Sequence, residues 1–179
     1  MPTYIALLRG INIGGQKIIP MATLRAHIES FEATDVQTYI QTGNIIFTHR
    51  ATDPVTLRRS LEAHWVKKFG CAIPTLVKTA RELRAIAGAN PYDTKLPDFG
   101  RHMYVCFFEK APLPSAIQSI QPYLSDVEQL IVKGLAGYAF YTNGLGRAKL
   151  SSAVIERKLG LATLRNWNTV TALLDMTSG

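Results

Sequence analysis

The sequence has little of what marks a disulfide-stabilised, metal-binding or membrane protein. Its 179 residues include only two cysteines, Cys71 and Cys106, and neither belongs to a CxxC pattern or to a cysteine and histidine array. We therefore predict no disulfide framework and no metal site. The first apolar run, residues 4–8, ends at Arg9 and is too short for a signal peptide, and no later run approaches a membrane span. These absences predict a cytoplasmic protein without a membrane partner.

Familiar catalytic patterns are missing as well. The four histidines fall in no Ser/His/Asp or Cys/His pattern, and the acidic residues are scattered without a pair that suggests acid–base or magnesium chemistry. Gly10 and Gly15 have the spacing of a P-loop, but Gln16 stands where that motif needs lysine, and GxGxxG is absent. No cofactor is predicted, and the sequence leaves open whether the protein is an enzyme.

What is present is an ordinary apolar content and a basic balance of charge. Apolar residues make up 47% of the chain, which suits one large domain or two small ones with a real core. The formal net charge is +7, and the isoelectric point is about 9.6. Such a balance favours anionic partners, either phosphate-bearing small molecules or nucleic acid.

The order of apolar patterns predicts an α+β fold built twice. Period-two and continuous apolar runs predict strands at residues 4–8, 36–41, 44–48, 73–78, 102–108, 130–133, 138–142 and 162–165. Helical spacing predicts helices at residues 20–31, 57–69, 79–86, 113–124, 150–159 and 169–176. The order is β-α-β-β-α-β followed by an extra helix, and it occurs twice. We predict two ferredoxin-like halves related by internal duplication.

The predicted boundaries follow from the same repeat. Half one covers residues 1–89 with a glycine-rich loop at 9–17, residues 90–101 form a linker, and half two covers residues 102–179. Gly70 and Gly160, Thr79 and Thr169, and Leu83 and Leu173 are separated by the same number of residues. The first strands are farther apart, so the glycine-rich loop is predicted to be an insertion that half two lacks.

The glycine-rich loop is the first part of the predicted ligand site. Glycines after a strand present successive backbone N–H groups to an anion, and Arg9 and Lys17 add positive charge. In an antiparallel ferredoxin-like sheet, the end of the first strand and the hairpin tip share one edge. The ligand-binding residues predicted in half one are Arg9, Gly10, Asn12, Gly14, Gly15, Lys17, Gln41, Gly43 and Asn44.

Half two is predicted to contribute two further segments. The loop at residues 143–149 and the segment at 165–169 share the opposite edge, and the loop runs into a helix N-terminus, which favours anions. The ligand-binding residues predicted here are Gly146, Arg147, Lys149, Arg165, Asn166, Trp167, Asn168 and Thr169. Asparagine and glycine also suit ordinary turns, and Trp167 suits a packing role, so a purely structural role is the alternative.

Four phrases carry a resemblance to a known family. LLRGINIGGQKIIPM, TYIQTGNIIF, GLGRAKL and RNWNTVT, in this order, resemble the bacterial domain of unknown function 1697 family. The departures are mild, with Ile13 where the family has valine and Thr42 where it has serine. The resemblance implies a duplicated α+β fold and makes residues 9–15, 41–44 and 165–169 the signature positions. It implies no established activity, cofactor or catalytic residue.

Three hypotheses about function remain. The leading one is non-catalytic binding of a phosphate-bearing small molecule, such as a nucleotide, by the glycine-rich loop and the hairpin tip. The second is a basic nucleic-acid-binding module, although no RNP1-like pattern is present. The third is an enzyme of open reaction type with a site between the halves. Its substrate would be polarised by Arg9, Asn12, Asn44, Arg147, Arg165 and Asn168.

Overall fold

The structure is a computed structural model that describes residues 1–12, 17–51 and 53–177. Two predicted ligand residues, Gly14 and Gly15, lie outside the described residues. The chain is mixed α and β, with two four-stranded sheets whose neighbouring strands are all antiparallel and seven α-helices in the described part. It divides into two compact units. The first unit is residues 1–85 with the C-terminal residues from Leu173, and the second unit is residues 86–172.

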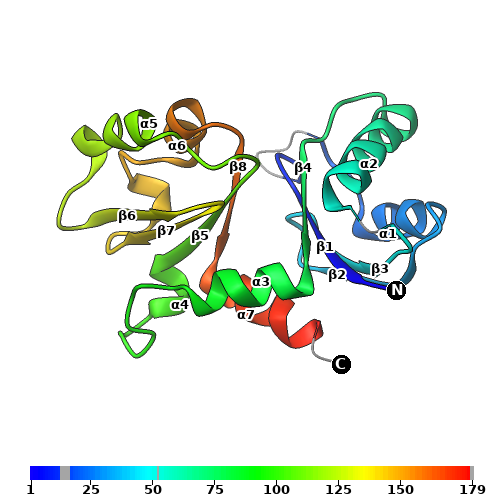
Figure 1. The fold of residues 1–179 in the computed structure, drawn as a ribbon, viewed down its shortest axis with the longest axis horizontal. Helices are drawn as coiled ribbons and strands as arrows, with labels where there is room; N and C mark the ends of the chain where they lie inside the picture. The colour runs from blue at the N-terminus through cyan, green and yellow to red at the C-terminus, as the bar shows by residue number, and fades with distance from the viewer. Residues whose placement is uncertain (13–16, 52, 178–179) are drawn as a thin grey trace. The chain divides into compact units, whose positions relative to one another are not determined.

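The sheet of the first unit has the strand order β2-β3-β1-β4 (Figure 1). Its strands are β1 (Thr3–Leu8), β2 (Thr34–Tyr39), β3 (Asn44–Thr48) and β4 (Thr75–Thr79). Helices α1 (Met21–Glu29) and α2 (Pro54–Phe69) cover one face of this sheet. Helix α2 ends at Gly70, whose φ of 68° is the left-handed conformation predicted for a glycine in this position.

Helix α3 (Ala80–Gly88) follows β4 and begins with the predicted capping box. The backbone N–H of Thr79 donates to Glu82 Oε2 over 2.7 Å, and the backbone N–H of Glu82 donates to Thr79 Oγ1 over 3.1 Å. These reciprocal bonds satisfy two amides that the first turn of a helix otherwise leaves unpaired.

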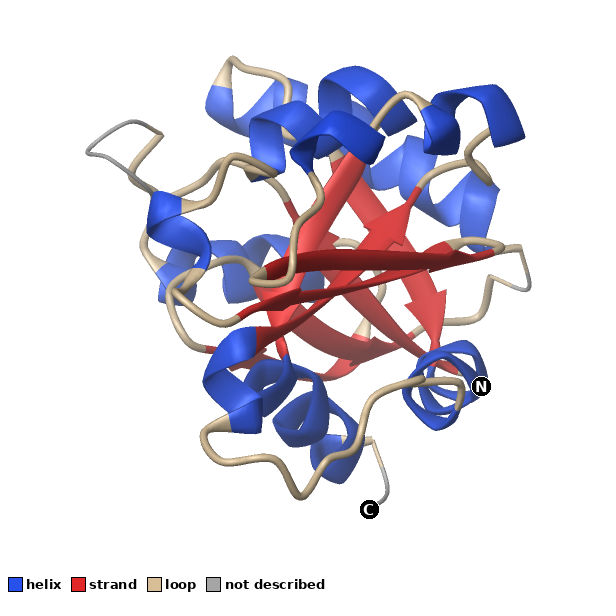
Figure 2. Ribbon diagram, turned by 90° about the vertical axis from the view of Figure 1, so that its left-hand side faces the viewer, coloured by secondary structure: helices blue, strands red, loops and turns tan. Residues whose placement is uncertain are grey.

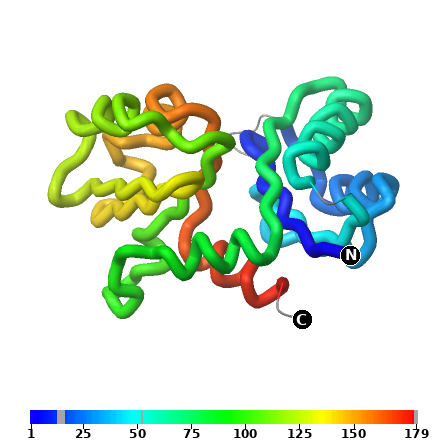
Figure 3. The backbone as a smooth tube through the Cα atoms, in the orientation of Figure 1, coloured from blue at the N-terminus to red at the C-terminus, as the bar shows by residue number. Residues whose placement is uncertain are grey.

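The sheet of the second unit has the strand order β6-β7-β5-β8. Figure 3 follows its chain from green through yellow to orange. Its strands are β5 (Met103–Phe108), β6 (Glu128–Lys133), β7 (Ala136–Tyr141) and β8 (Ala162–Asn166). The α-helices after α3 are α4 (Phe99–His102), α5 (Pro114–Gln118), α6 (Ser152–Leu159) and α7 (Trp167–Met176), and α7 belongs to the first unit from Leu173 onward. The short 3₁₀ helices are η1 (Gln121–Tyr123) and η2 (Leu145–Arg147). Helices and strands are distinguished by colour in Figure 2.

The central strands are buried on both faces, as the continuous apolar run at residues 4–8 predicts. On β1, Tyr4, Ala6 and Leu8 belong to the core beneath α1 and α2, while Ile5 and Leu7 on the other face are completely buried. On β5, the same alternation puts Cys106 into a core with α6, and Val105 on the other face is again buried. Strands buried on both faces read as uninterrupted hydrophobic runs rather than as alternating ones.

Two elements of the second unit differ from the prediction. The predicted helix at residues 113–124 is divided into α5 and η1, because Pro122 has no N–H to donate and cannot continue an α-helix. The predicted turn at residues 134–137 is shorter, since β7 already begins at Ala136. Gly137 lies inside the strand, where an added Cβ would stand 3.1 Å from both Leu130 Cδ1 and Phe108 Cε2. Its role is therefore close packing in the core.

Candidate functional site

The end of β1 meets two other segments at one edge of the first sheet. The backbone N–H of Leu8 donates to the carbonyl of Gly43 over 2.8 Å, which joins β1 to the tip of the β2–β3 hairpin. The backbone N–H of Arg9 donates to the carbonyl of Pro74 over 2.9 Å, which joins the start of the loop to the segment before β4. The sequence predicted the first of these neighbours.

Asn12 fastens the base of the glycine-rich loop. Its side-chain Nδ2 donates to the carbonyls of Ile19 and Gln41, each over 2.9 Å, and its Oδ1 accepts from the backbone N–H of Ile19 over 2.7 Å. Its backbone N–H also donates to the carbonyl of Lys17 over 3.2 Å. The φ of Asn12 is +55°, a left-handed conformation that asparagine tolerates better than most residues. The side chain of Asn12 therefore holds the loop closed and ties it to the hairpin.

Close packing at Gly43 and side-chain hydrogen bonds of Asn44 fix the tip of the hairpin. Gly43 has a φ of +79°, and an added Cβ would stand 2.8 Å from Leu8 Cβ and 2.9 Å from Ile11 Cδ1. Asn44 is completely buried, and its Nδ2 donates over 3.1 Å to both the carbonyl of Tyr39 and Oγ1 of Thr42. Both residues serve the turn, which is the structural role weighed as the alternative.

Among the described residues predicted to bind a ligand at this edge, Gly10, Lys17 and Gln41 are exposed, and Arg9 and Asn12 are partly exposed. Gly10 has a φ of +70° and no heavy atom within 4 Å of the position of a Cβ. Lys17 Nζ donates to the carbonyl of Ala72 over 3.0 Å, and among the described residues no carboxylate pairs with it. The edge thus combines basic side chains with a glycine whose Cβ position is open.

The predicted anion-binding turn of the second unit already holds an anionic group of the protein. Glu128, at the start of β6, accepts from the backbone N–H of Lys149 over 3.0 Å and from that of Leu150 over 2.8 Å. These two residues immediately precede Ser151, the N-cap of α6, which accepts from the N–H of Val154 over 3.3 Å. Two backbone N–H groups just before this helix are therefore satisfied by an internal carboxylate.

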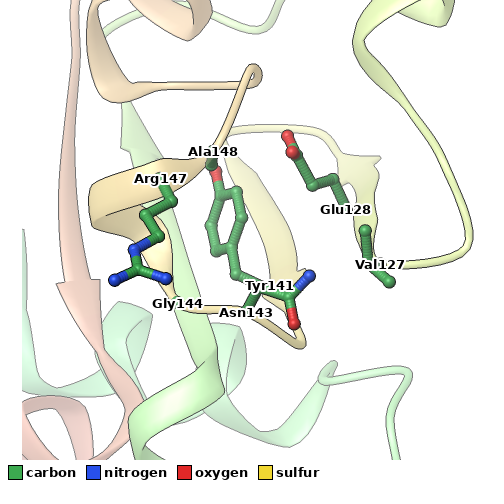
Figure 4. A pocket seen from close by; sticks show the side chains of 7 residues that line it. All are labelled: Val127, Glu128, Tyr141, Asn143, Gly144, Arg147 and Ala148. Atoms are coloured by element: carbon green, nitrogen blue, oxygen red, sulfur yellow. The ribbon is translucent and has the colours of Figure 1, made fainter.

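The same turn forms one wall of a pocket of about 410 Å³. The residues that line it are Val127, Glu128, Tyr141, Asn143, Gly144, Arg147 and Ala148, shown in Figure 4. Sequence analysis named Arg147 but missed Glu128 and Tyr141, because they lie on strands away from the glycine-rich turn. Gly146 and Lys149 are exposed on the turn and do not line the pocket.

The segment at 165–169 is largely committed to the fold. Arg165 is only 7% exposed, and its guanidinium donates to Thr163 Oγ1 over 2.7 Å and to the carbonyl of Leu164 over 2.9 Å. Burial lowers the pKa of Arg165 to about 10, so the group stays charged at neutral pH. Asn166 Oδ1 accepts from the backbone N–H of Thr169 over 2.9 Å.

Trp167 and Asn168 also have neighbours within the second unit. The ring of Trp167 meets Phe99 edge-on with centroids 5.6 Å apart. Asn168 is exposed, and its Oδ1 lies 1.8 Å from where a Cβ on Gly100 would stand. The ring of Trp167 thus packs on Phe99 within the second unit, whereas ligand roles for the segment stay a prediction.

A buried lysine in the first unit was also missed by sequence analysis. Lys78, in β4, is 6% exposed, and burial lowers its pKa, while the neighbouring charge of Glu82 opposes that shift. The strand pattern alone gave no signal, because lysine alternates with apolar residues on many half-exposed strands.

Three histidines of the first unit lie in an aromatic cluster. His64 contacts His27, Phe31 and Trp65, with ring centroids 5.5 to 5.8 Å apart. The ring of His49 stacks on Phe31 at 5.5 Å. In the described part of the chain, the buried Nε2 of His64 has no hydrogen-bond partner. The described residues include no group of three or more His, Cys, Asp or Glu arranged to hold a metal ion.

The His64 cluster predicts weaker folding in acid. Burial, and then the charges of His27, Lys68 and Lys67, lower the pKa of His64 below its ordinary value. The unfolded chain therefore binds this proton more readily, so stability is complete above a pH of about 6.5 and declines as the pH falls toward the folded-state pKa. We expect the melting temperature of His64→Gln to fall less between pH 7.5 and 5.5 than that of wild type. Parallel declines would contradict this assignment.

Comparisons with known proteins identify a family and a shared fold. The family described as "Protein of unknown function (DUF1697)" matches residues 1–138. A conserved bacterial protein from Streptococcus pneumoniae matches with a TM-score of 0.72 over 98% of each chain, at 19% sequence identity. No curated protein matches the chain. In the described residues, no helix is both long and apolar enough to cross a bilayer.

Proposed function

The chain belongs to the DUF1697 family, and we propose that it binds an anionic, phosphate-bearing small molecule at the loop after β1. The observation that carries the proposal is the closed base of this loop. Asn12 joins the start of the loop to Ile19 and to the hairpin at Gln41, so the two ends of the loop are held together on a fixed frame. A frame that is ordered before binding lowers the entropy cost of capturing a ligand.

The chemistry at the edge suits a phosphate. Arg9 and Lys17 flank the loop, and the open space at the Cβ position of Gly10 leaves room for an anion. Amide N–H groups arranged in a concave turn, together with cationic side chains, are the usual partners of phosphate oxygens. The net charge of +7 adds a long-range attraction for such ligands.

We propose further that the fold arose by duplication of a ferredoxin-like half, with residues 1–89 and 102–179 as the halves and 90–101 as the linker. The matching sheet orders β2-β3-β1-β4 and β6-β7-β5-β8 support this. Residues 9–20 separate β1 from α1, whereas only residues 109–113 separate β5 from α5. The longer connection contains the glycine-rich loop, which supports its interpretation as an insertion with a ligand-binding purpose.

A small molecule suits the first unit better than RNA does. RNA-recognition sheets stack bases on exposed aromatic residues of their central strands. On the face of the first sheet away from α1 and α2, the central strands carry Ile5 and Leu7 on β1 and Asn44 and Ile46 on β3, and all four are buried. The face therefore has no aromatic platform among these positions. The proposal involves binding without a catalytic step.

Replacing Lys17 tests this site. We expect pyrophosphate or a nucleoside triphosphate to raise the melting temperature of wild type, because a ligand at a hundredfold its dissociation constant adds about 2.7 kcal/mol. Lys17→Ala is expected to weaken that binding by roughly tenfold, the loss of one charge-assisted hydrogen bond. Lys67→Ala, an exposed position on α2, removes the same charge elsewhere in the first unit.

The comparison of the two lysine variants decides between a site and general electrostatics. If both variants lose the same affinity, or if no phosphate compound shifts wild type, the loop does not bind phosphate. A selective loss in Lys17→Ala that persists in 150 mM salt supports the site, since a screened surface attraction weakens for both variants alike.

A further inference from the structure

We infer that the pocket of the second unit binds a zwitterionic small molecule, which donates N–H groups to Glu128 and places a carboxylate or phosphate beside Arg147. This ligand class differs from that of the loop in the first unit, and the inference does not depend on the proposed function. The pocket volume of about 410 Å³ lies within the usual range for metabolite-binding sites.

The walls of the pocket are tied together by hydrogen bonds. Glu128 fastens the turn before α6 to the start of β6 through Lys149 and Leu150. The hydroxyl of Tyr141 donates to the carbonyl of Leu150 over 2.8 Å, which fastens the same turn to β7. The backbone N–H of Thr142 donates to the carbonyl of Val127 over 3.0 Å, closing the other side. The cavity is therefore formed before any ligand enters.

Glu128 keeps capacity to accept further hydrogen bonds. Each of its carboxylate oxygens receives one backbone N–H, and a carboxylate has about four acceptor positions in all. The residue is only partly buried and lines the pocket. The N–H groups of an ammonium or a guanidinium can donate to the acceptor positions that the two backbone N–H groups leave.

Arg147 supplies the opposite charge. It is exposed, it lines the pocket, and among the described residues it forms no ion pair within 4.0 Å. In Figure 4, Arg147 and Glu128 lie on either side of the Tyr141 ring, with Asn143 below. A simple anion in this pocket would meet the charge of Glu128, and a simple cation would meet that of Arg147. A ligand that carries both charges can pair its cationic group with Glu128 and its anionic group with Arg147.

Matched ligands test this charge pattern. L-Arginine and phosphoethanolamine each combine a cationic N–H donor with an anionic group, which is a carboxylate in the first and a phosphate in the second. Agmatine, which is arginine without its carboxylate, and ethanolamine, which lacks the phosphate, remove only the anion. We expect at least one zwitterion to bind by calorimetry about tenfold or more tightly than its matched partner lacking the anion. Inorganic phosphate alone is expected to bind weakly.

Matched variants assign the binding to the pocket. Arg147→Gln is expected to weaken binding of the zwitterion by about tenfold while leaving binding of its anion-free partner unchanged. Arg157→Gln, at an exposed position on α6, removes an equal charge outside the pocket and is expected to have no such effect. Glu128→Gln is expected to abolish binding of both ligands, and if this variant does not fold, the two arginine variants decide.

The inference is overturned if neither zwitterion binds, if each zwitterion binds no more tightly than its matched partner, or if the two arginine variants lose affinity equally. Lys17→Ala separates this site from the loop of the first unit. It is expected to leave zwitterion binding unchanged, so a negative result at one site does not contradict the proposal for the other site.

Discussion

Gly43→Ala is expected to destabilise the protein by about 2–5 kcal/mol, through a left-handed backbone and overpacking acting together. At a φ of +79°, any residue with a Cβ is strained. The added methyl would also stand 2.8 Å from Leu8 Cβ, at the end of the central strand, and 2.9 Å from Ile11 Cδ1. Leu8 and Ile11 are fully buried, so neither has room to move away.

Gly70→Ala provides the matched control for Gly43→Ala. Gly70 has a similar φ of +68°, but no heavy atom lies within 4 Å of the position of a Cβ. This variant is expected to cost only about 1–2 kcal/mol, the strain of the left-handed conformation alone. Urea unfolding of both variants, followed by the fluorescence of the buried Trp65, measures the difference. Equal destabilisation would show that Leu8 and Ile11 do not restrict the turn.

Gly43 also shows how far sequence could predict this site. A glycine between two β-rich runs predicts a hairpin, and the hairpin is present from Thr34 to Thr48. The antiparallel order of strands predicts that the hairpin tip lies beside the end of β1, which the bond between Leu8 and Gly43 confirms. The contacts that exclude a side chain at Gly43 come from residues far away in sequence, and no local pattern encodes them.

At the pocket of the second unit, the sequence predicts the turn but not the carboxylate that pairs with it. The glycines around Arg147 predict a turn that runs into a helix N-terminus, whose free amides favour an anion. The structure pairs two backbone N–H groups just before that helix, those of Lys149 and Leu150, with Glu128 on β6, while ligand roles for the turn stay a prediction. Local propensity identifies groups that need a partner, whereas the identity of the partner depends on tertiary structure. Gly137 was misplaced for the same reason, since its contacts with Leu130 and Phe108 decide whether it bends the chain or packs within a strand.

Replacing Asn12 is expected to cost both stability and ligand binding. Asn12→Gly keeps the left-handed conformation and removes the bonds to Ile19 and Gln41, so it is expected to destabilise by about 2–3 kcal/mol, near 1 kcal/mol for each bond. Asn12→Ala adds backbone strain at a φ of +55° and is expected to cost about 1–2 kcal/mol more. Urea unfolding of the two variants separates the hydrogen bonds from the strain. A loss below about 0.5 kcal/mol in Asn12→Gly would contradict the role of Asn12 in closing the loop.

Phosphate binding by variants at Asn12 and Lys17 distinguishes a preorganised binding loop from a surface that attracts phosphate by charge alone. Lys17→Ala removes a cation whose hydrogen bond to the carbonyl of Ala72 is exposed, so it is expected to weaken phosphate binding with little change in stability. Asn12→Gly leaves every charge in place, yet it is expected to weaken phosphate binding as well, because the loop must then be ordered at the moment of binding. If Asn12→Gly binds phosphate as tightly as wild type at a temperature where both are folded, charge alone attracts the ligand. If it binds more weakly with the charges unchanged, the closed base of the loop is part of the site.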